Sequence, residues 1–411
     1  MKIRKVEIKK GLRKDMKSVF DICDFGAQAG GKTKNTKAIQ DAIDECHRAG
    51  GGMVLCGAGT FLTGALLLKS NVELHLAAGC RLAGSGDLAD YPDFAAQGFR
   101  GEYAPEKSVK YLVGAAGAEN ISITGPGELN GSGPAFYEPD LTAAKLPKPP
   151  TPRPRIIMFF QCRKVLFEGA SFADSPCWTF WLMQCREVNV HRVRISGNRR
   201  LRNVDGIDVD SCRNVTISDC IMDTEDDCVV LRAIQSMYAS PAVCENITVS
   251  NCVLESACQG IRIGCPGDAV IRNCSFSNLV INSAANGITI QHPKRYLPKG
   301  SRGLADIHDI VFSNIAINCR SKPIWIFVEE EIALQRLSDL SFANLRIKSG
   351  DPCLVQGSRE TTIRNISFSN IEIETSGDDA IILRNCENVR LDNTGLTNRR
   401  EQPAGAGQAA V

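Results

Sequence analysis

The stretch Asn214-Val215-Thr216-Ile217 returns 32 residues later as Asn246-Ile247-Thr248-Val249. In both copies a polar residue precedes an apolar–polar–apolar triplet, and this period of two is typical of a β-strand with one buried face. Related segments recur along the chain, beginning at Asn120, Lys164, Glu187, Asn214, Asn246, Asn273, Asp309, Asp339, Asn365 and Asn388. From Lys164 onward their spacings are 23, 27, 32, 27, 36, 30, 26 and 23 residues. Periods of about 20 to 50 residues indicate a repeat architecture.

The repeats favour a solenoid of strands over other repeat folds. After residue 60 the repeated segments show no apolar stripe with helical spacing, which excludes helical solenoids. Propeller blades need about 40 to 45 residues, more than most of these spacings. Asn, Gly, Asp and Ser crowd the ends of the segments, where turns need them. We therefore predict an all-β fold, a parallel β-helix of about ten coils, with hydrogen-bonded ladders of Asn at the coil corners.

One helix is predicted at about residues 35–49, ahead of the repeats. Asn35 or Thr33 is placed to cap it, and Gly50-Gly51-Gly52 ends it. Its buried stripe is predicted to consist of Ile39, Ala42, Ile43 and Cys46. Because terminal repeats need a cap, we expect this helix to cover the open end of the first coil. We expect residues 1–18 to be an N-terminal extension, 19–397 the β-helix domain and 398–411 a flexible tail.

Composition excludes several classes of protein. The 411 residues carry a formal net charge of only +2, with the basic residues scattered, so no nucleic-acid or membrane partner is expected. There is no apolar run of about 18 residues that could cross a membrane. The five histidines and the absence of paired cysteines with ligand spacing argue against a metal site, and we expect no cofactor.

The 18 cysteines resemble a disulfide framework, but their positions argue otherwise. Cys220, Cys252 and Cys274 occupy similar places in successive repeats, as buried thiols inside a coil do. Residues 1–18 lack the apolar core of a signal peptide. Free thiols without an export signal favour the cytoplasm. A secreted or periplasmic location is the alternative if a leader is missing.

A cluster of carboxylates marks the candidate site. Asp205 lies in Asn203-Val204-Asp205-Gly206-Ile207-Asp208, and Asp226 and Asp227 lie in Glu225-Asp226-Asp227-Cys228. Asp205 and Asp226 are 21 residues apart, about one coil, which places their backbones about 5 Å apart. Neighbouring carboxyls raise one another's pKa, so one site can hold an acid and a base, as glycosidic hydrolysis requires. A common pocket is essential to this hypothesis, and a carboxyl hidden behind an ion pair would count against it.

The same residues carry a family resemblance. Asn-x-Asp-Gly-Ile-Asp at 203–208 and Asp-Asp-Cys at 226–228 resemble the signature of glycoside hydrolase family 28, the polygalacturonases. Further similar segments, spread over roughly residues 20–395, are Phe25-Gly26-Ala27, Leu62 to Val72, Arg153-Pro154-Arg155 and Ser175 to Thr179. The resemblance implies a right-handed, single-stranded parallel β-helix and an inverting hydrolase. It makes Asp226 the general acid, gives Asp205 and Asp227 the attacking water, and lets Asn203 orient the site by hydrogen bonding.

The chain departs from the family pattern at two places. Cys258-Gln259-Gly260 stands where members carry Gly-His-Gly, and Thr289-Ile290-Gln291 stands where galacturonate binders carry Arg-x-Lys. Two cations that would bind the sugar carboxylate are therefore missing, and such charge-assisted pairing is hard to replace. The predicted substrate-binding residues are Asn203, Gln259, Arg262, Gln291 and His292, with Arg232, Lys294 and Arg295 also within reach. A surface ion pair for Arg262 and a turn position for Gln259 are the competing interpretations.

Three functions stay open at this stage. The first is an inverting hydrolase that cleaves a pectin-related poly- or oligosaccharide other than plain polygalacturonate. Exo action would need a closed end of the cleft, and residues 92–118 and 137–155 are long enough to close it. The second is a catalytically inactive carbohydrate-binding solenoid, which the missing His, Arg and Lys favour. The third, ranked lower, is a lyase or epimerase, since few basic residues fall in the repeated face. The oligomeric state is left open.

Overall fold

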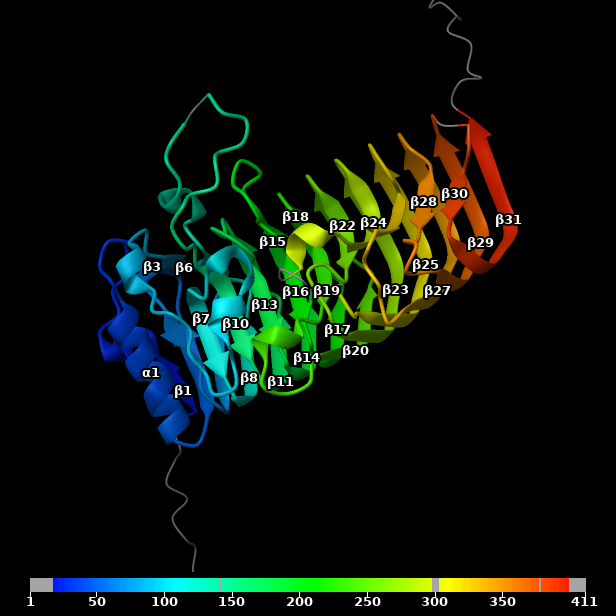
Figure 1. Cartoon of the computed structure of the whole chain (residues 1–411). Helices are drawn as coiled ribbons and strands as arrows, with labels where there is room; N and C mark the ends of the chain where they lie inside the picture. Colours follow the sequence, from blue (N-terminus) through cyan, green and yellow to red (C-terminus); the bar gives the residue numbers. More distant parts are fainter. Residues whose placement is uncertain (1–17, 141, 298–302, 377, 399–411) are drawn as a thin grey trace, which may run out of the picture.

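A computed structural model describes residues 18–140, 142–297, 303–376 and 378–398, and it shows a solenoid of stacked coils (Figure 1). Every strand pairs in parallel with its counterpart in the next coil, and the pairs form three long ladders. The predicted parallel β-helix is therefore confirmed. The predicted extension (1–18) and tail (398–411) fall almost wholly outside the described residues.

The first ladder runs along the face of the solenoid where the repeated triplets lie. Its strands are β1 (Val19–Asp21), β2 (Gly52–Cys56), β5 (Val72–Leu76), β8 (Glu119–Thr124), β11 (Arg163–Glu168), β14 (Arg186–His191), β17 (Arg213–Ser218) and β20 (Val243–Ser250). Within the triplets of these strands from β8 to β20 the two apolar residues are buried and the residue between them is not, as for Val215, Thr216 and Ile217. The period of two in the sequence thus decides which side chains enter the core.

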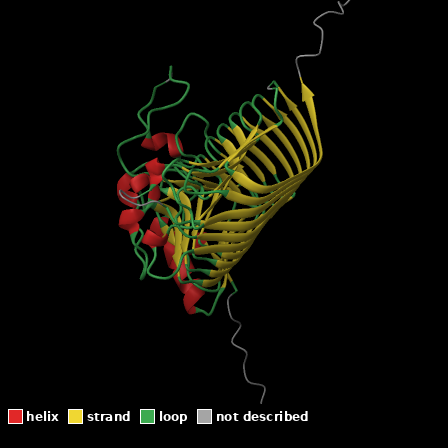
Figure 2. Ribbon diagram, turned by 45° about the vertical axis from the view of Figure 1, so that its right-hand side comes forward, coloured by secondary structure: helices red, strands yellow, loops and turns green. Residues whose placement is uncertain are grey.

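The second ladder follows the first after a corner in each coil. Its strands are β3 (Gly59–Thr63), β6 (Cys80–Gly84), β9 (Glu128–Asn130), β12 (Ser171–Ala173), β15 (Arg194–Ser196), β18 (Ile221–Thr224) and β21 (Val253–Ser256). Beyond them, single long strands run through both ladders: β23 (Val270–Ser283), β25 (Asp306–Cys319), β27 (Arg336–Ser349), β29 (Ile363–Thr375) and β31 (Cys386–Asn398). Figure 2 shows these long strands as regular parallel ribbons toward the C-terminal end.

The third ladder is a separate parallel sheet and carries the candidate site. Its strands are β4 (Leu66–Leu67), β7 (Tyr111–Ala116), β10 (Arg155–Phe160), β13 (Phe180–Met183), β16 (Ile207–Asp210), β19 (Val229–Arg232), β22 (Gln259–Ile263), β24 (Asn286–His292), β26 (Ile324–Val328), β28 (Cys353–Gln356) and β30 (Ile381–Arg384). Around its middle strands lie short 3₁₀ turns, namely η3 (Gly101–Tyr103), η4 (Pro105–Lys107), η6 (Gln235–Met237) and η7 (Lys294–Tyr296). The other turns are η1 (Ile22–Phe25), η2 (Leu88–Asp90) and η5 (Gly133–Phe136).

The corners between the first two ladders are closed by a column of asparagines. All six asparagines of this column have φ between 48° and 56°, in the left-handed region that Asn tolerates. They are Asn251, Asn278, Asn314, Asn344, Asn370 and Asn393. From Asn278 onward, each side chain donates to the asparagine in the coil before it, at 2.8 to 3.3 Å, for example Asn344 to Asn314 at 3.0 Å. The predicted ladders of Asn are confirmed.

The cysteines are free thiols, as predicted. Cys220 and Cys252 are 1% exposed and lie in the same column, because β18 and β21 pair in register. Cys274 is also buried, but it is in register with Ile247 and so belongs to another column. The prediction of buried thiols holds for all three, whereas the shared column holds for two.

The predicted helix is α1 (Thr36–Arg48), and its buried residues are the predicted stripe of Ile39, Ala42, Ile43 and Cys46. It packs on η1 and on strands of the first coils and lies at the β1 end of the solenoid (Figure 1). Asn35 is its N-cap residue, but the Asn35 side chain accepts from the Gln28 backbone N–H instead of capping the helix. No helix among the described residues is long and apolar enough to cross a membrane.

Candidate active site

A cavity of about 410 Å³ lies over the middle of the third ladder. Asp205, Asp226 and Asp227 line it together with Asn203. Its other lining residues are Tyr103, Pro105, Glu106, Trp178, Arg232, Ile234, Ser236, Arg262, Cys265, Pro266, Gly267, Asp268, Arg295, Tyr296 and Leu297. The floor thus comes from the strand ladder and the walls from the loops around η3, η4 and η7. The three predicted carboxyls meet at one pocket.

Local backbone geometry turns both adjacent aspartates toward that pocket. In a strand, Asp226 and Asp227 would point to opposite faces. The structure instead places Glu225 to Cys228 in a bend between β18 and β19. The nearest ligand atoms of Asp226, Asp227 and the Cys258 thiol all lie within 4.8 Å of one another. The bend therefore resolves the conflict between neighbouring positions and a shared site.

The electrostatics of the cluster favour keeping a proton. Burial raises the pKa of Asp205 well above its usual range, and repulsion from Asp208, Asp226 and Asp227 raises it further. Burial, followed by repulsion from Asp226, raises the pKa of Asp227 to about 7, although the Arg262 guanidinium opposes this. Because the carboxyls interact, the protons are shared by the cluster and do not belong to one residue.

Asp227 forms an ion pair, which bears directly on the hydrolase hypothesis. Arg262 Nη1 lies 3.1 Å from Asp227 Oδ2, and the guanidinium also contacts the Cys265 thiol. The pair ties up one carboxyl oxygen only. Asp227 Oδ1 is buried without a hydrogen-bond partner among the described residues, and so is Asp205 Oδ1. Each base candidate therefore has one carboxyl oxygen outside any ion pair or hydrogen bond with the described residues, although that atom is itself buried.

Asn203 contacts the candidate acid directly. Its Nδ2 donates to Asp226 Oδ2 at 3.3 Å, and its backbone φ of 58° is one that Asn adopts more readily than most residues. Asp226 is half-buried, whereas Asp205 and Asp227 are almost fully buried. The structure thus brings Asn203 and the three aspartates together.

Three predicted substrate contacts lie elsewhere. Gln259, Gln291 and His292 are 5%, 6% and 2% exposed and are not among the residues lining the cavity. His292 shares the inward parity of Ile288 and Ile290 along β24, and burial lowers its pKa to about 4. Gln291 is in register with the larger Phe327 in the next coil. Burial in the ladder therefore removes these side chains from the pocket.

Of the four candidate cations, three line the cavity and one does not. Arg262, Arg232 and Arg295 line the cavity, whereas Lys294 forms an ion pair with Glu331. Arg262 is 9% exposed, lines the cavity and pairs with Asp227, so the competing interpretation of an ion pair at the surface is wrong: the pair is buried at the cavity.

A buried platform supports the floor of the cavity. Arg232 Nη2 lies 2.5 Å from Asp208 Oδ1, and the Arg232 guanidinium sits 4.0 Å from the centre of the Trp178 ring. Arg155 lies 4.5 Å from the same ring and 4.3 Å from that of Trp181. Trp181 is 0% exposed and packs against Arg155, whereas Trp178 is 4% exposed, packs against both guanidinium groups and also lines the cavity.

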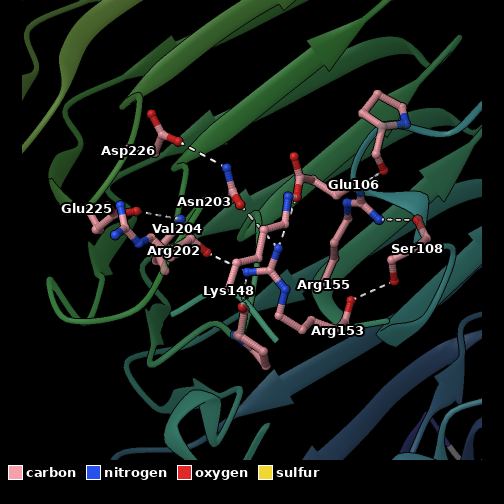
Figure 3. Close-up of polar contacts among 12 residues, drawn as sticks. Glu106, Ser108, Lys148, Arg153, Arg155, Arg202, Asn203, Val204, Glu225 and Asp226 are labelled. Atoms are coloured by element: carbon pink, nitrogen blue, oxygen red, sulfur yellow. Dashed lines mark hydrogen bonds and ion pairs between the residues drawn. The ribbon is translucent and has the colours of Figure 1, made fainter. Parts of the chain in front are cut away.

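Two residues that connect the cavity wall to Asp226 were not predicted from the sequence. Glu106 accepts from Arg153 Nη2 at 3.0 Å and pairs with Lys148. The same Nη2 donates to Asn203 Oδ1 at 3.2 Å, as Figure 3 shows. Arg153 was visible only as part of a family-like Arg-Pro-Arg segment. Glu106 lies in an irregular loop, where no repeat marks it.

Within the described part of the chain, Asp226, Asp227 and Cys258 are the one group of His, Cys, Asp and Glu close enough to share a metal ion. The Arg262 guanidinium already pairs with Asp227, and a second cation beside it would be repelled. The residues present therefore do not favour a metal at this site.

The model of the glycosyl hydrolases family 28 matches residues 94–398 of the chain. The chain belongs to this family. Among curated relatives, a protein named "Probable polygalacturonase" from Vitis vinifera is 30% identical over 219 residues, which cover 52% of this chain and 44% of that protein. The matched part of the chain thus spans less than half the length of this relative.

Solved structures agree on the fold. The family 28 exopolygalacturonase of Yersinia enterocolitica aligns with a TM-score of 0.68 at 20% identity, over 90% of this chain and 78% of that one. The hyperthermoactive exopolygalacturonase of Thermotoga maritima aligns with a TM-score of 0.66 at 22% identity, over 92% of both chains. The right-handed parallel β-helix implied by the resemblance to family 28 is therefore confirmed.

Proposed function

We propose that this family 28 protein is an inverting glycoside hydrolase that acts on a pectin-related poly- or oligosaccharide, with residues 19–397 as its catalytic domain. The observation that carries the proposal is the meeting of Asp205, Asp226 and Asp227 at one cavity, where burial and mutual repulsion raise carboxyl pKa values. In such a cluster one carboxyl can stay protonated near neutral pH while another is ionised, which acid–base chemistry at one site needs.

In the proposed mechanism Asp226 protonates the glycosidic oxygen of the leaving group. Asp205 and Asp227, which both line the cavity, hold the attacking water by hydrogen bonds, and one of the two carboxylates takes its proton as the water attacks the opposite face of the sugar. Arg262 compensates the charge that Asp227 carries before the transfer. Acid and base then return to their starting states when the cluster exchanges one proton with solvent.

The substrate proposed is not plain polygalacturonate. The two positions where family members carry Arg-x-Lys hold Thr289 and Gln291, which are 0% and 6% exposed. Tyr103, Pro105 and Glu106 line the cavity and belong to residues 92–118, the stretch expected to close one end of the cleft, which supports exo action. The predicted cytoplasmic location has no support in the comparisons, and a pectic substrate suits the secreted or periplasmic alternative better.

The test is product analysis on a panel of pectic fragments: oligogalacturonides, rhamnogalacturonan fragments and rhamnosylated oligosaccharides. We expect one class to be cleaved, with monosaccharide alone released and with inverted anomeric configuration in the first product seen by NMR. Oligosaccharide products would contradict exo action. Retained configuration would contradict the assignment of Asp205 and Asp227 as water-activating groups.

A second candidate function is glycan binding without turnover. The observation that favours it is the replacement of the family histidine by Gln259, which is buried outside the cavity lining. Binding of a fragment by calorimetry, with no product over a day and the same affinity in the Asp205→Asn variant, would establish this function in place of hydrolysis.

A further inference from the structure

The Arg153 guanidinium is buried and is held in place by five hydrogen bonds. Arg153 is 2% exposed and lies in the proline-rich segment 147–154, directly before β10. Its hydrogen bonds run from Nη1 to the Tyr137 hydroxyl (2.6 Å) and the carbonyls of Arg202 (2.6 Å) and Pro176 (3.2 Å), and from Nη2 to Glu106 Oε2 (3.0 Å) and Asn203 Oδ1 (3.2 Å). The guanidinium therefore has a fixed orientation, with one arm directed at Asn203 (Figure 3).

This contact decides which way the Asn203 carboxamide points. A guanidinium can only donate hydrogen bonds, so the Asn203 atom that faces Arg153 must be the acceptor, Oδ1. The other end, Nδ2, then faces Asp226 Oδ2 at 3.3 Å and can only donate to it. Without Arg153 the carboxamide could turn over at almost no cost in shape, because its oxygen and nitrogen ends are alike in size.

We propose that Arg153 is a positioning residue for the proton-donating Asp226, acting through Asn203. By fixing the carboxamide it keeps Asp226 Oδ2 as a hydrogen-bond acceptor and leaves Oδ1 to carry the proton that the leaving group receives. The inference rests on the hydrolase function proposed above. It adds a residue that does not line the cavity and does not touch the sugar.

The bond from Asn203 matters most after the proton has gone. A carboxylate accepts a hydrogen bond more strongly than a carboxylic acid does, so the Nδ2 donor stabilises the state that follows proton transfer. A reversed carboxamide would instead present its oxygen, accept the proton of Asp226 and hold it back. Arg153 also bonds to Glu106 in the cavity wall, so the same guanidinium joins the wall to the acid.

The experiment is a double-mutant cycle of Arg153→Gln and Asn203→Gly, assayed on the pectic fragment that the wild type cleaves. Glycine is chosen because the φ of 58° at Asn203 suits it, so the side chain is removed without backbone strain. We expect Arg153→Gln to lower kcat by about 10- to 100-fold, with KM unchanged. In the Asn203→Gly background the same change should lower kcat no further.

A second readout separates positioning from loss of stability. In Arg153→Gln the alkaline limb of the kcat profile should move to higher pH, because a reversed carboxamide retains the proton on Asp226. The matched control is Tyr137→Phe, which removes another partner of Arg153 but leaves its bond to Asn203. That control should leave kcat and its pH profile unchanged.

Each outcome decides the inference. Additive losses in the cycle, or an unmoved pH profile, overturn it while leaving the hydrolase function intact. No turnover by the wild type on any fragment overturns both. If Arg153→Gln does not fold, Arg153→Lys takes its place, because an ammonium keeps one donor without the rigid fork. Its smaller loss of kcat must likewise vanish in the Asn203→Gly background.

Discussion

The C-terminal coils and the site-bearing coils are built from the same ladders but are stabilised differently. In the C-terminal half, Phe276, Phe312, Phe342 and Phe368 stack in one column, with ring centres 4.8 to 5.0 Å apart and planes within 12°. Around the cavity, Asp205, Asp208, Asp210, Asp227, Arg232 and Arg262 are buried, and each has at least one polar atom without a partner among the described residues. Such atoms cost stability.

The contrast indicates a division of labour along the axis of the solenoid. Regular coils supply apolar stacking, and the middle coils use part of that stability to hold charges at a site that can do chemistry. Because each coil contacts only its neighbours, coils far from the cavity affect it only through the coils between them. Substitutions in the two regions should therefore separate activity from stability.

The largest effect is expected for Asp226→Asn at the cavity. Loss of the general acid should lower kcat at least about 1,000-fold, while the melting temperature stays within about 2 °C of the wild type. Reducing-sugar release and thermal melting measure the two quantities. Asp223→Asn is the matched control, since Asp223 lies outside the cavity lining on β18 and pairs with Arg199. Equal losses in both variants would contradict the assignment of Asp226.

The reciprocal result is expected for Phe312→Ala in the regular coils. This side chain is fully buried between two rings, so its removal should cost about 3–5 kcal/mol of the free energy of unfolding. Urea denaturation measures the loss. Because the cavity is lined by other coils, kcat at 25 °C should change by less than about twofold. A drop in kcat as large as that of Asp226→Asn would mean that the two regions are not independent.

A smaller effect concerns pH. Because burial raises the pKa of Asp227 to about 7 and holds that of Asp205 well above its usual range, the folded state keeps protons that the unfolded chain has already lost. Stability should therefore decrease as pH rises from about 4 through 7. In Asp205→Asn the fall in melting temperature between pH 5 and pH 8 should be a few degrees smaller. An unchanged fall would show that Asp205 is ionised in the folded state.

The smallest effect is expected at the corner column. Asn344 donates to Asn314 and accepts from Asn370, with a φ of 56°. Asn344→Ala should cost about 1–2 kcal/mol, from the lost bonds and the left-handed backbone. Asn344→Gly loses the same bonds without the strain, so it should cost less. Urea midpoints in the reverse order would contradict this account of the corners.

The sequence predicted the ladders because their rule is local. Alternation in triplets such as Val215-Thr216-Ile217 and the Asn at each corner are enough to place side chains inside or outside. The spacing of Asp205 and Asp226 worked for the same reason, since one coil separates them. The same alternation predicts a buried His292, because this residue shares the parity of the buried Ile288 and Ile290.

The contacts of Glu106 and Arg153 could not be predicted in this way. They join an irregular loop, a proline-rich segment and Asn203, whose positions no repeat determines. The orientation of Asp226 and Asp227 also depends on a bend and not on strand alternation. Prediction from the sequence therefore ended where the backbone leaves the ladders, which is where the cavity is built.

The asparagine column has a consequence for how the binding pocket can change. The corners it closes stay constant from coil to coil, so differences in coil length fall on the two connections that flank the third ladder. There β30 ends at Arg384 and β31 begins at Cys386, whereas β24 ends at His292 and β25 begins only at Asp306. The residues of this longer connection include Arg295 and Tyr296 of the pocket. Insertions and exchanges at that edge can thus remodel specificity, in nature or by loop grafting, without disturbing the scaffold.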